Sequence, residues 1–383
     1  MKTIKLGDLC YPCESQVSED PDTLIDYVDI SSVDNQNKQI TGYQTIKFGE
    51  APSRARKYLN KGNILVSTVR PNLNAVALFE ESTPNISVAS TGFCVLNCKP
   101  STDKGFLFHY CKSKSFINAM VSQATGASYP AVSDKIVRAA MVPAYTYEEQ
   151  CRIRTVLDLV SSIIVKQKKE LEQLDCLIKA RFVELYNTSF LGEETTIEAI
   201  TERVKVGFVG TCEKYYTSNS GIPMLRTGNI TNNGINLSDL KYVTNDFHEK
   251  NKKSQILEGD ILIARHGSNG QANVYYGPEA QCLNAVVIVP NNEIATSVFL
   301  AGLINSPMVK EQIVRTLVGS TQHVVNTKSI AGLVVRIPNL EVQKEYEDFV
   351  NQIDKSKVVV PSKIKNAIFA IMLSVSFGQI TSI

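Results

Sequence analysis

Gly62-Asn63-Ile64-Leu65-Val66 returns 197 residues later as Gly259-Asp260-Ile261-Leu262-Ile263, and this repetition decides the fold. An arginine follows each copy, Arg70 in the first and Arg265 in the second. The period is too long for the unit of a solenoid, and it has the size of one domain plus one helix. The sequence therefore predicts a duplicated, pseudo-two-fold molecule.

A loop of small residues and a later glutamine accompany each copy. The loops are Thr125-Gly126-Ala127-Ser128 and Val318-Gly319-Ser320-Thr321, and the glutamines are Gln150 and Gln343. A long helical pattern follows each glutamine. The repeat therefore extends over nearly the whole chain.

The stretch after the first loop predicts a long coiled-coil helix over residues 148–186. It contains neither Gly nor Pro, and its seam positions step alternately by four and three residues. The eight positions are Ile153, Leu157, Val160, Ile164, Gln167, Leu171, Leu174 and Ile178, and all of them except Gln167 are apolar. Such a narrow, sustained stripe is typical of a coiled coil and not of a helix packed on a globular core.

A similar heptad pattern predicts a distal helix over residues 339–383. Its seam runs from Tyr346 to Ile371, but Pro361 interrupts it after a β-branched run. Proline removes a backbone hydrogen bond, so we expect a kink or a break near this residue.

Between the helices lie two globular regions, 1–147 and 187–338. Each mixes short apolar runs with turn-rich stretches, and each has a helical stretch before its final loop. We expect an α/β (α+β) fold: two similar domains with curved sheets, linked by two long helices that form an antiparallel coiled coil. The expected strands are 63–68, 75–79, 261–264 and 285–289, and the helical stretches are 104–123 and 295–317.

Composition restricts the class of protein. The 383 residues are 43% hydrophobic and 20% charged, so each half can bury a core. The net charge is only +2, so any nucleic-acid surface must come from uneven placement of charge. The sequence shows neither a membrane span nor a signal peptide, and we expect a cytoplasmic protein.

The nine cysteines are scattered and odd in number, which favours reduced thiols over a disulfide framework. Two close pairs exist, Cys10 with Cys13 and Cys94 with Cys98. A zinc site built from the four is the alternative, but the pairs lie far apart and neither has a histidine beside it. We therefore expect no bound metal.

Signatures of catalysis are missing. The chain contains no phosphate-binding P-loop, no dinucleotide fingerprint, no H-E-x-x-H zinc motif and no G-x-S-x-G nucleophile elbow. Its four histidines have no apparent partner nucleophile. Two ordered domains joined by coiled coil, without catalytic residues, indicate a recognition and assembly subunit.

The order of domain, helix, domain and helix resembles the specificity subunit of type I restriction–modification systems. The resemblance rests on G-[DN]-I-L in each domain, a Gly-Ser/Thr loop before each helix, and helix starts of the form Pro-x(5–7)-Gln in the first repeat and Pro-x(4–6)-Gln in the second. The stretch Phe349–Lys357 is especially similar to that family's distal helix. Pro361 departs from the pattern.

The resemblance implies two target recognition domains, each of which reads one half of a split double-stranded DNA sequence. The helices would pair antiparallel as a spacer and hold two methyltransferase subunits, with restriction translocase subunits attached to those. The subunit itself would have no catalytic centre. S-adenosylmethionine, ATP and magnesium would belong to the partners. A helix of 39 residues, about 58 Å long, can hold two domains on successive major-groove faces.

In the first domain, the densest basic segment predicts phosphate contacts, with a solvated charge run as the alternative. It comprises Arg54, Arg56, Lys57 and Tyr58.

Arg70 follows an apolar run and precedes Pro71-Asn72, a position from which arginine can reach guanine edges. The loop adds the hydroxyl of Ser128 and the ring of Tyr129. We therefore include Asn72, Ser128 and Tyr129 with Arg70 among the predicted DNA contacts.

The second domain offers counterparts, with Gln322 suited to bidentate recognition of adenine. The predicted contacts are Arg226, Lys252, Lys253, Arg265, His266, Thr321, Gln322 and His323. For each of them, a structural hydrogen bond or a loop cap is the alternative.

Two other functions stay open at this point: a coiled-coil scaffold for protein partners only, and an enzyme that acts on a small substrate near His266. The duplicated helices favour recognition or scaffolding over catalysis. The bases recognised, the spacer length and whether the complex restricts or only methylates have no signature in the sequence.

Overall fold

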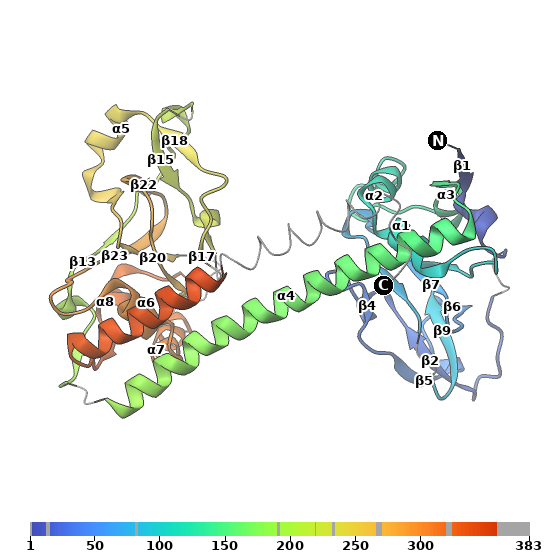
Figure 1. Cartoon of the computed structure of the whole chain (residues 1–383), viewed down its shortest axis with the longest axis horizontal. Coiled ribbons are helices and arrows are strands. Elements are labelled where there is room, and N and C mark those ends of the chain that lie inside the picture. Colours follow the sequence, from blue (N-terminus) through green and yellow to red (C-terminus); the bar gives the residue numbers. More distant parts are fainter. Residues whose placement is uncertain are drawn as a thin grey trace. The chain divides into compact units, whose positions relative to one another are not determined.

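The longest element is α4, an unbroken helix of 42 residues, Tyr147–Thr188 (Figure 1). The computed structural model describes residues 2–12, 16–80, 83–189, 192–218, 220–231, 234–265, 270–318 and 324–357, without the side chains of 317 and 318. A reciprocal cap starts α4: the Thr146 amide donates to Glu149 Oε2 (2.8 Å), and the Glu149 amide donates to Thr146 Oγ1 (3.3 Å). Such a capping box satisfies amides that have no partner within the helix.

The chain divides into two units. Unit 1 comprises the described residues up to Val165, and unit 2 comprises the described residues from Lys166 onward. The helix α4 therefore begins in unit 1 and ends in unit 2. Each unit has its own sheets and its own buried core.

Unit 1 is built on two main sheets. A four-stranded sheet has the order β5-β2-β9-β6, and a three-stranded sheet has the order β10-β7-β8. In the first, β2 and β9 run parallel and the other neighbours antiparallel. The strands of unit 1 are β1 (Thr3–Lys5), β2 (Leu24–Val28), β3 (Val33–Asp34), β4 (Gln39–Ile40), β5 (Gln44–Lys47), β6 (Ala55–Tyr58), β7 (Ile64–Ser67), β8 (Val76–Leu78), β9 (Ile86–Ser90), β10 (Phe93–Leu96) and β11 (Met141–Pro143).

Unit 2 has the same plan. Its sheets have the orders β14-β18-β15-β22-β19 and β13-β23-β20-β21, with β15 and β22 parallel. The strands are β12 (Thr195–Thr196), β13 (Thr201–Val206), β14 (Tyr216–Thr217), β15 (Ile222–Leu225), β16 (Ile230–Thr231), β17 (Gly234–Ile235), β18 (Lys241–Val243), β19 (Gln255–Ile256), β20 (Ile261–Ala264), β21 (Ala272–Val274), β22 (Ala280–Cys282), β23 (Ala285–Pro290) and β24 (Val334–Val335). The predicted mixed α/β fold with a linking helix is confirmed.

The helices repeat as well, and here one expectation needs correction. Each predicted helical stretch before the final loop is two helices and not one. In unit 1 the break falls at Ser113, whose Oγ accepts the Phe116 amide (3.1 Å); in unit 2 it falls at Ser306, whose Oγ accepts the Val309 amide (3.5 Å). The bounds are α1 (Lys104–Lys112), α2 (Lys114–Val121) and α3 (Asp134–Ala139) in unit 1, and α5 (Asn245–Lys250), α6 (Ser297–Asn305), α7 (Pro307–Val318) and α8 (Thr327–Ala331) in unit 2.

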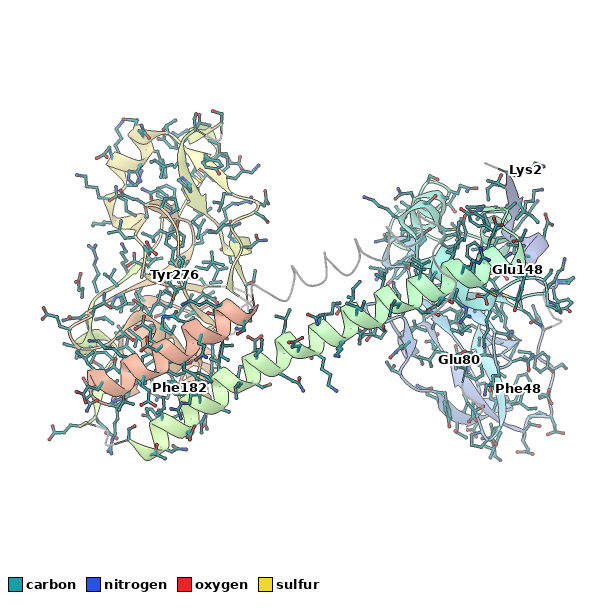
Figure 2. All side chains as sticks on the ribbon, viewed as in Figure 1. Lys2, Phe48, Glu80, Glu148, Phe182 and Tyr276 are labelled. Atoms are coloured by element: carbon teal, nitrogen blue, oxygen red, sulfur yellow. The ribbon has the colours of Figure 1, made fainter. Side chains whose placement is uncertain are left out.

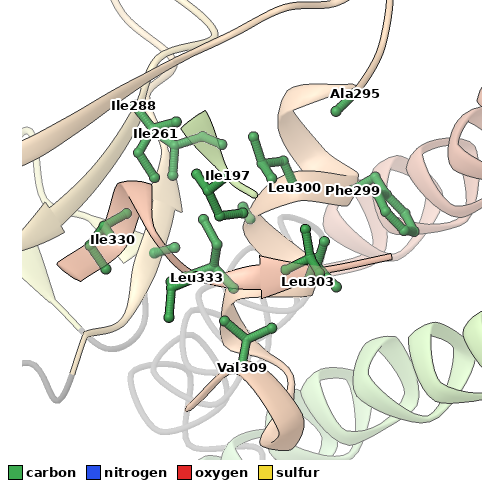
Figure 3. Close-up of a cluster of buried hydrophobic side chains, with 14 of the residues drawn as sticks. Ile197, Ile261, Ile288, Ala295, Phe299, Leu300, Leu303, Val309, Ile330 and Leu333 are labelled. Atoms are coloured by element: carbon green, nitrogen blue, oxygen red, sulfur yellow. The ribbon is translucent and has the colours of Figure 1, made fainter. Parts of the chain in front are cut away.

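Apolar side chains from the sheet and from the helices that cover it form each core. In unit 2, the buried cluster brings Ile261 and Ile288 of the sheet against Phe299 and Leu303 of α6 (Figure 3). In unit 1, residues of β7 and β10 pack in the same way against α1 and α2. The repeated G-[DN]-I-L strands β7 and β20 are fully buried, which explains their apolar sequence.

Residues 340–357 form a helix that packs on the C-terminal part of α4 within unit 2. Arg181 pairs with Glu345, and Lys357 pairs with Asp175 (2.7 Å), so the two helices run antiparallel here. Phe182 of α4 lies at this junction (Figure 2) and meets the Tyr346 ring at 5.4 Å, edge to face. The predicted kink at Pro361 lies outside the described residues.

The predicted seam of α4 is only half-buried. Phe182 and Leu185, just beyond it, are fully buried, whereas Leu157 within it is 37% exposed. Among the described residues, no helix is long and apolar enough to cross a membrane.

Candidate nucleic-acid interface

In unit 1, the loop after α2 is joined to the end of β7. The Val132 amide donates to the Thr68 carbonyl (2.9 Å), and the Arg70 amide donates to the Pro130 carbonyl (2.7 Å). Gly126 makes the turn possible, because it has φ +102° and a Cβ there would lie 2.8 Å from the Tyr129 carbonyl oxygen. The fold therefore brings the predicted residues Arg70, Ser128 and Tyr129 to one edge of the unit.

Arg70 and Tyr129 form an exposed cation–π pair. The guanidinium carbon of Arg70 lies 4.7 Å from the centre of the Tyr129 ring, and Tyr129 is 69% exposed. Stacking restricts the arginine while its N–H edge stays available for hydrogen bonds. This arrangement can present a guanidinium to a base edge or to a phosphate.

The turn after Arg70 is held in an unusual backbone conformation. Arg70 (φ 48°) and Asn74 (φ 49°) are both left-handed, and they flank the 3-10 turn Pro71–Leu73. Asn74 is anchored through its Nδ2, which donates to the Cys111 carbonyl (2.9 Å), while its own carbonyl accepts a hydrogen bond from Lys38. Burial lowers the pKa of Lys38 from its usual value, although Asp34 partly opposes this.

Two neighbours on the same turn are exposed, Asn72 and Leu73. Left-handed non-glycine residues carry strain that a fold retains mainly at functional positions. The apolar Leu73 is 47% exposed beside these polar groups. Sequence reasoning did not select Leu73, and only its place after Asn72 could have suggested it.

The basic segment of unit 1 is only partly available to a ligand. Lys57 is bound to Asp134 and to the Phe93 carbonyl (2.6 Å). The Tyr58 hydroxyl donates to Glu19 (2.8 Å). Both side chains are therefore engaged within the protein, which differs from the solvated charge run that was the alternative to phosphate contact.

The arginines of the same segment remain nearer to solvent. Arg56 lies over the Phe48 ring at 5.3 Å and is half-buried, whereas Arg54 is exposed. They are the better candidates for phosphate contact.

In unit 2, Arg226 is engaged inside the protein. Its Nη2 donates to the Asp239 carboxylate (3.1 Å) and to the Asp239 carbonyl (3.1 Å), and its backbone amide donates to Asn229 Oδ1 (2.9 Å). The side chain closes a loop, which matches the structural alternative for this residue.

Lys252 and Lys253 are exposed at the surface of unit 2. A buried polar network lies directly behind them: Gln281 accepts from Ser254 (2.5 Å), and its Nε2 meets His248 Nδ1 (3.1 Å). This network fixes the backbone that carries the lysines. The sequence holds no local signal for it, because its members come from separate elements.

Arg265 is not the structural counterpart of Arg70. The Val325 amide donates to the Arg265 carbonyl (3.1 Å), the bond that Thr68 makes in unit 1. Four further predicted contacts lie outside the described residues: His266, Thr321, Gln322 and His323. Over the part of the chain that the structure describes, no three His, Cys, Asp or Glu side chains gather as metal ligands would.

The solved structures that resemble this fold define its class. One comes from a study of complex assembly and conformational transition of the type I R-M system, with a TM-score of 0.56, 20% identity and coverage of 97% of this chain and 96% of that one. Another is the S subunit of a type I restriction–modification system from M. genitalium, with a TM-score of 0.57, 13% identity and coverage of 97% and 94%. The fold is therefore that of a type I specificity subunit.

Sequence comparison finds similarity to the same kind of protein. Residues 203–369 match the model of the type I restriction modification DNA specificity domain. The EcoBI specificity subunit of Escherichia coli is 20% identical over 290 residues, and the MjaVIII specificity subunit of Methanocaldococcus jannaschii is 24% identical over 273. These matches cover 68% and 66% of this chain, and they span 61% and 64% of the relatives' lengths. The chain is therefore similar to type I restriction–modification specificity subunits, the resemblance that its repeated motifs predict.

Proposed function

We propose that this chain is the DNA-recognition subunit of a type I restriction–modification complex. Each predicted domain, 1–147 and 187–338, reads one half of a bipartite target. The helices act as spacer and as the docking site for two methyltransferase subunits, with restriction translocase subunits attached to those, in the cytoplasm. The chain itself is not catalytic, and S-adenosylmethionine, ATP and magnesium are bound by its partners.

One observation carries this proposal: the rigid, exposed group of Arg70, Asn72 and Tyr129 at the end of a buried strand. A stacked arginine on a fixed turn is suited to bidentate hydrogen bonds with guanine O6 and N7. Arg56 lies on β6 and Arg54 lies just before that strand; both suit contact with phosphates, which fix register without reading sequence.

A domain exchange tests whether each domain reads its own half of the target. Residues 187–338 are replaced by the equivalent domain of a relative, and the methylated motif is mapped with the methyltransferase partner present. One half of the motif should change and the other should stay. A change in both halves would contradict the modular assignment.

Point variants test the assigned contacts within unit 1. Arg70→Ala should relax the preference for one G·C pair in the first half-site, a loss of about 1–3 kcal/mol of discrimination. Arg54→Ala should instead weaken binding equally for all sequences and reduce the slope of log affinity against log salt by about 1. Lys47→Ala, in an exposed ion pair with Asp22, is the matched control and should change neither.

A scaffold that binds only proteins is the second candidate, because α4 leaves apolar residues such as Val165 62% exposed. It predicts no salt-dependent DNA binding by the chain with its methyltransferase partner under any condition. Measured binding would therefore exclude it.

A further inference from the structure

Cys10 and Cys98 face each other across a short antiparallel bridge in unit 1. Backbone hydrogen bonds flank the pair on both sides: the Tyr11 amide donates to Asn97 (2.8 Å), and the Lys99 amide donates to Leu9 (3.0 Å). This pattern makes Cys10 and Cys98 a non-hydrogen-bonded pair, in which the Cα atoms lie about 4.5 Å apart and the side chains share a face. A disulfide requires a Cα separation of about 4.4–6.8 Å, so the backbone needs no movement to form one.

The two thiols are already in contact. A hydrogen bond to Cys98, reinforced by burial, raises the pKa of the Cys10 thiol far above its usual range. Cys10 therefore stays protonated and donates to the sulfur of Cys98. Cys10 is 2% exposed, whereas Cys98 is partly exposed, so a reagent from solvent reaches Cys98 first.

Positive charge surrounds the pair. The charges of Arg138 and Lys99 both act to lower the pKa of Cys10, against the larger opposing effects. Arg138 is held by the Tyr11 carbonyl (2.6 Å) and the Gly7 carbonyl (3.3 Å), and its Nη1 is buried with no hydrogen-bond partner among the described residues. Cationic neighbours and partial exposure are the conditions under which a cysteine reacts as thiolate.

Two other cysteines of unit 1, Cys94 and Cys111, are poorly placed to compete. Cys94 precedes Cys98 by four residues of largely extended chain, a separation of about 13 Å. Cys94 and Cys111 are both fully buried. The Cys94–Cys98 spacing in the sequence is therefore not a structural pair, and the partner of Cys98 comes from the distant N-terminal segment.

We propose that Cys10 and Cys98 are a redox modification site that forms a reversible disulfide with hydrogen peroxide as oxidant. The Cys98 thiolate attacks one peroxide oxygen, the O–O bond breaks, and the products are a sulfenic acid and hydroxide, which takes up the proton that the Cys98 thiol gave up. The Cys10 sulfur then attacks the Cys98 sulfur, the S–S bond forms, and the sulfenic oxygen leaves as water with the Cys10 proton. Two thiols are oxidised, and one peroxide is reduced to two waters.

The bond would act on unit 1 alone. It would fasten the N-terminal segment, with its 3-10 turn Leu6–Leu9, to the chain that follows β10. The residues of unit 2 that correspond to Cys10 and Cys98 are Thr201 of β13 and Pro290 of β23, which are paired in the same way. Neither of these two residues contains sulfur. This site is independent of the proposed DNA-recognition function.

The test uses the full chain, treated with hydrogen peroxide, quenched with an alkylating reagent and mapped by peptide mass spectrometry. The expected result is a Cys10–Cys98 cross-linked peptide that a dithiol reductant removes. The oxidised chain should unfold at a temperature higher by roughly 5–10 °C, because the bond closes a long loop.

Matched variants separate the pair from the other thiols. Cys98→Ser and Cys10→Ser should abolish the cross-link, whereas Cys13→Ser and Cys176→Ser should retain it; Cys176 is exposed on α4 and reports general oxidation. A cross-link from Cys10 to Cys13 in the wild-type chain would overturn the assignment. So would Cys98 oxidised to sulfinic acid with Cys10 still free, a result that does not depend on how any variant folds.

Discussion

Units 1 and 2 share a framework but differ where each would meet a ligand. The sheet order β5-β2-β9-β6 of unit 1 corresponds to β18-β15-β22-β19 of unit 2, which adds only the edge strand β14. Among the predicted contacts, Arg70 of unit 1 is stacked on Tyr129, whereas Arg226 of unit 2 is bound to Asp239. The framework thus repeats its buried hydrogen bonds, and the exposed groups are free to differ.

Gln150 and Gln343 show why the framework repeats. Each glutamine is almost fully buried. Gln150 Oε1 accepts a hydrogen bond from the backbone amide of Asp103, the residue that caps α1 (2.9 Å). Gln343 Oε1 accepts one from the backbone amide of Thr296, the residue that caps α6 (3.0 Å). A buried amide without a partner costs more than an average hydrogen bond contributes. The fold therefore requires the two glutamines, and their presence gives no information about the ligand.

The largest expected effect compares two positions on α4, one near its C-terminal end and one near its middle. Phe182 is 5% exposed and contacts the rings of Phe299 and Tyr346, both at 5.4 Å. Phe182→Ala should lower the free energy of unfolding by about 3–5 kcal/mol. Val165→Ala, at a 62% exposed position of the same helix, should change it by less than about 0.5 kcal/mol. Denaturant unfolding measures both, and similar losses would show that these two positions of α4 are packed alike.

The second prediction compares the two glutamines. Gln343→Leu should cost about 3 kcal/mol, because Gln343 also donates to Ile294 (3.0 Å) and Pro338 (2.9 Å). Gln150→Leu should cost about 2 kcal/mol, because Gln150 donates only to Tyr145 (3.0 Å) among the described bonds.

Gln352→Leu, at an exposed position of helix 340–357, is the matched control for the glutamine variants. It should leave the free energy of unfolding within about 0.5 kcal/mol of the wild-type value. A loss for Gln343→Leu no greater than that of the control would remove the glutamine from the framework.

Features of the fold that depend on short, continuous stretches of sequence were predictable. The Gly-to-Leu repeat, the absence of Gly and Pro over residues 148–186, and the loops before the helices correctly indicated the duplication and the central helix. These features depend on residues that are neighbours in the chain, so periodicity and turn chemistry report them directly.

Features that depend on distant partners were not predictable. Lys57 is paired with Asp134, 77 residues away, and Cys10 lies beside Cys98. Arg265 corresponds to Thr68 and not to Arg70, because its carbonyl accepts a backbone hydrogen bond from the Val325 amide. No local sequence pattern distinguishes a lysine in an ion pair from a lysine that is available to bind a phosphate.

The third prediction concerns the loop that carries Tyr129. Gly126→Ala places a Cβ 2.8 Å from the Tyr129 carbonyl at a φ of +102°, so it should destabilise unit 1 by about 1–3 kcal/mol. Gly228→Ala in unit 2 is the control, because a Cβ there meets nothing within 4 Å. Thermal unfolding of both variants gives the comparison. Equal shifts in Tm would mean that the loop adopts another conformation in solution.

The smallest expected effect is a pH dependence confined to unit 1. His109 is the sixth residue of α1, and the sixth residue of the equally long α6 is Gly302. Burial lowers the pKa of His109 below its usual value, while the hydrogen bond that His109 donates to Asp158 (2.7 Å) opposes the shift. As the pH falls through about 6.5, the unfolded chain binds the proton before the folded chain does, so unit 1 loses stability until the folded-state pKa is passed.

His109→Gln should remove this loss, because glutamine can keep a hydrogen bond to Asp158 but does not titrate. The loss of stability is measured by hydrogen exchange of the α1 and α6 amides at about pH 7.5 and about pH 5.5, because the amides of each helix report on the stability of their own unit. In the wild-type chain, acid should accelerate opening of α1 relative to α6 after correction for the intrinsic exchange rates. In the variant, the two helices should respond alike. If α6 responds to acid as strongly as α1 in the wild-type chain, the groups responsible belong to the shared framework and not to His109.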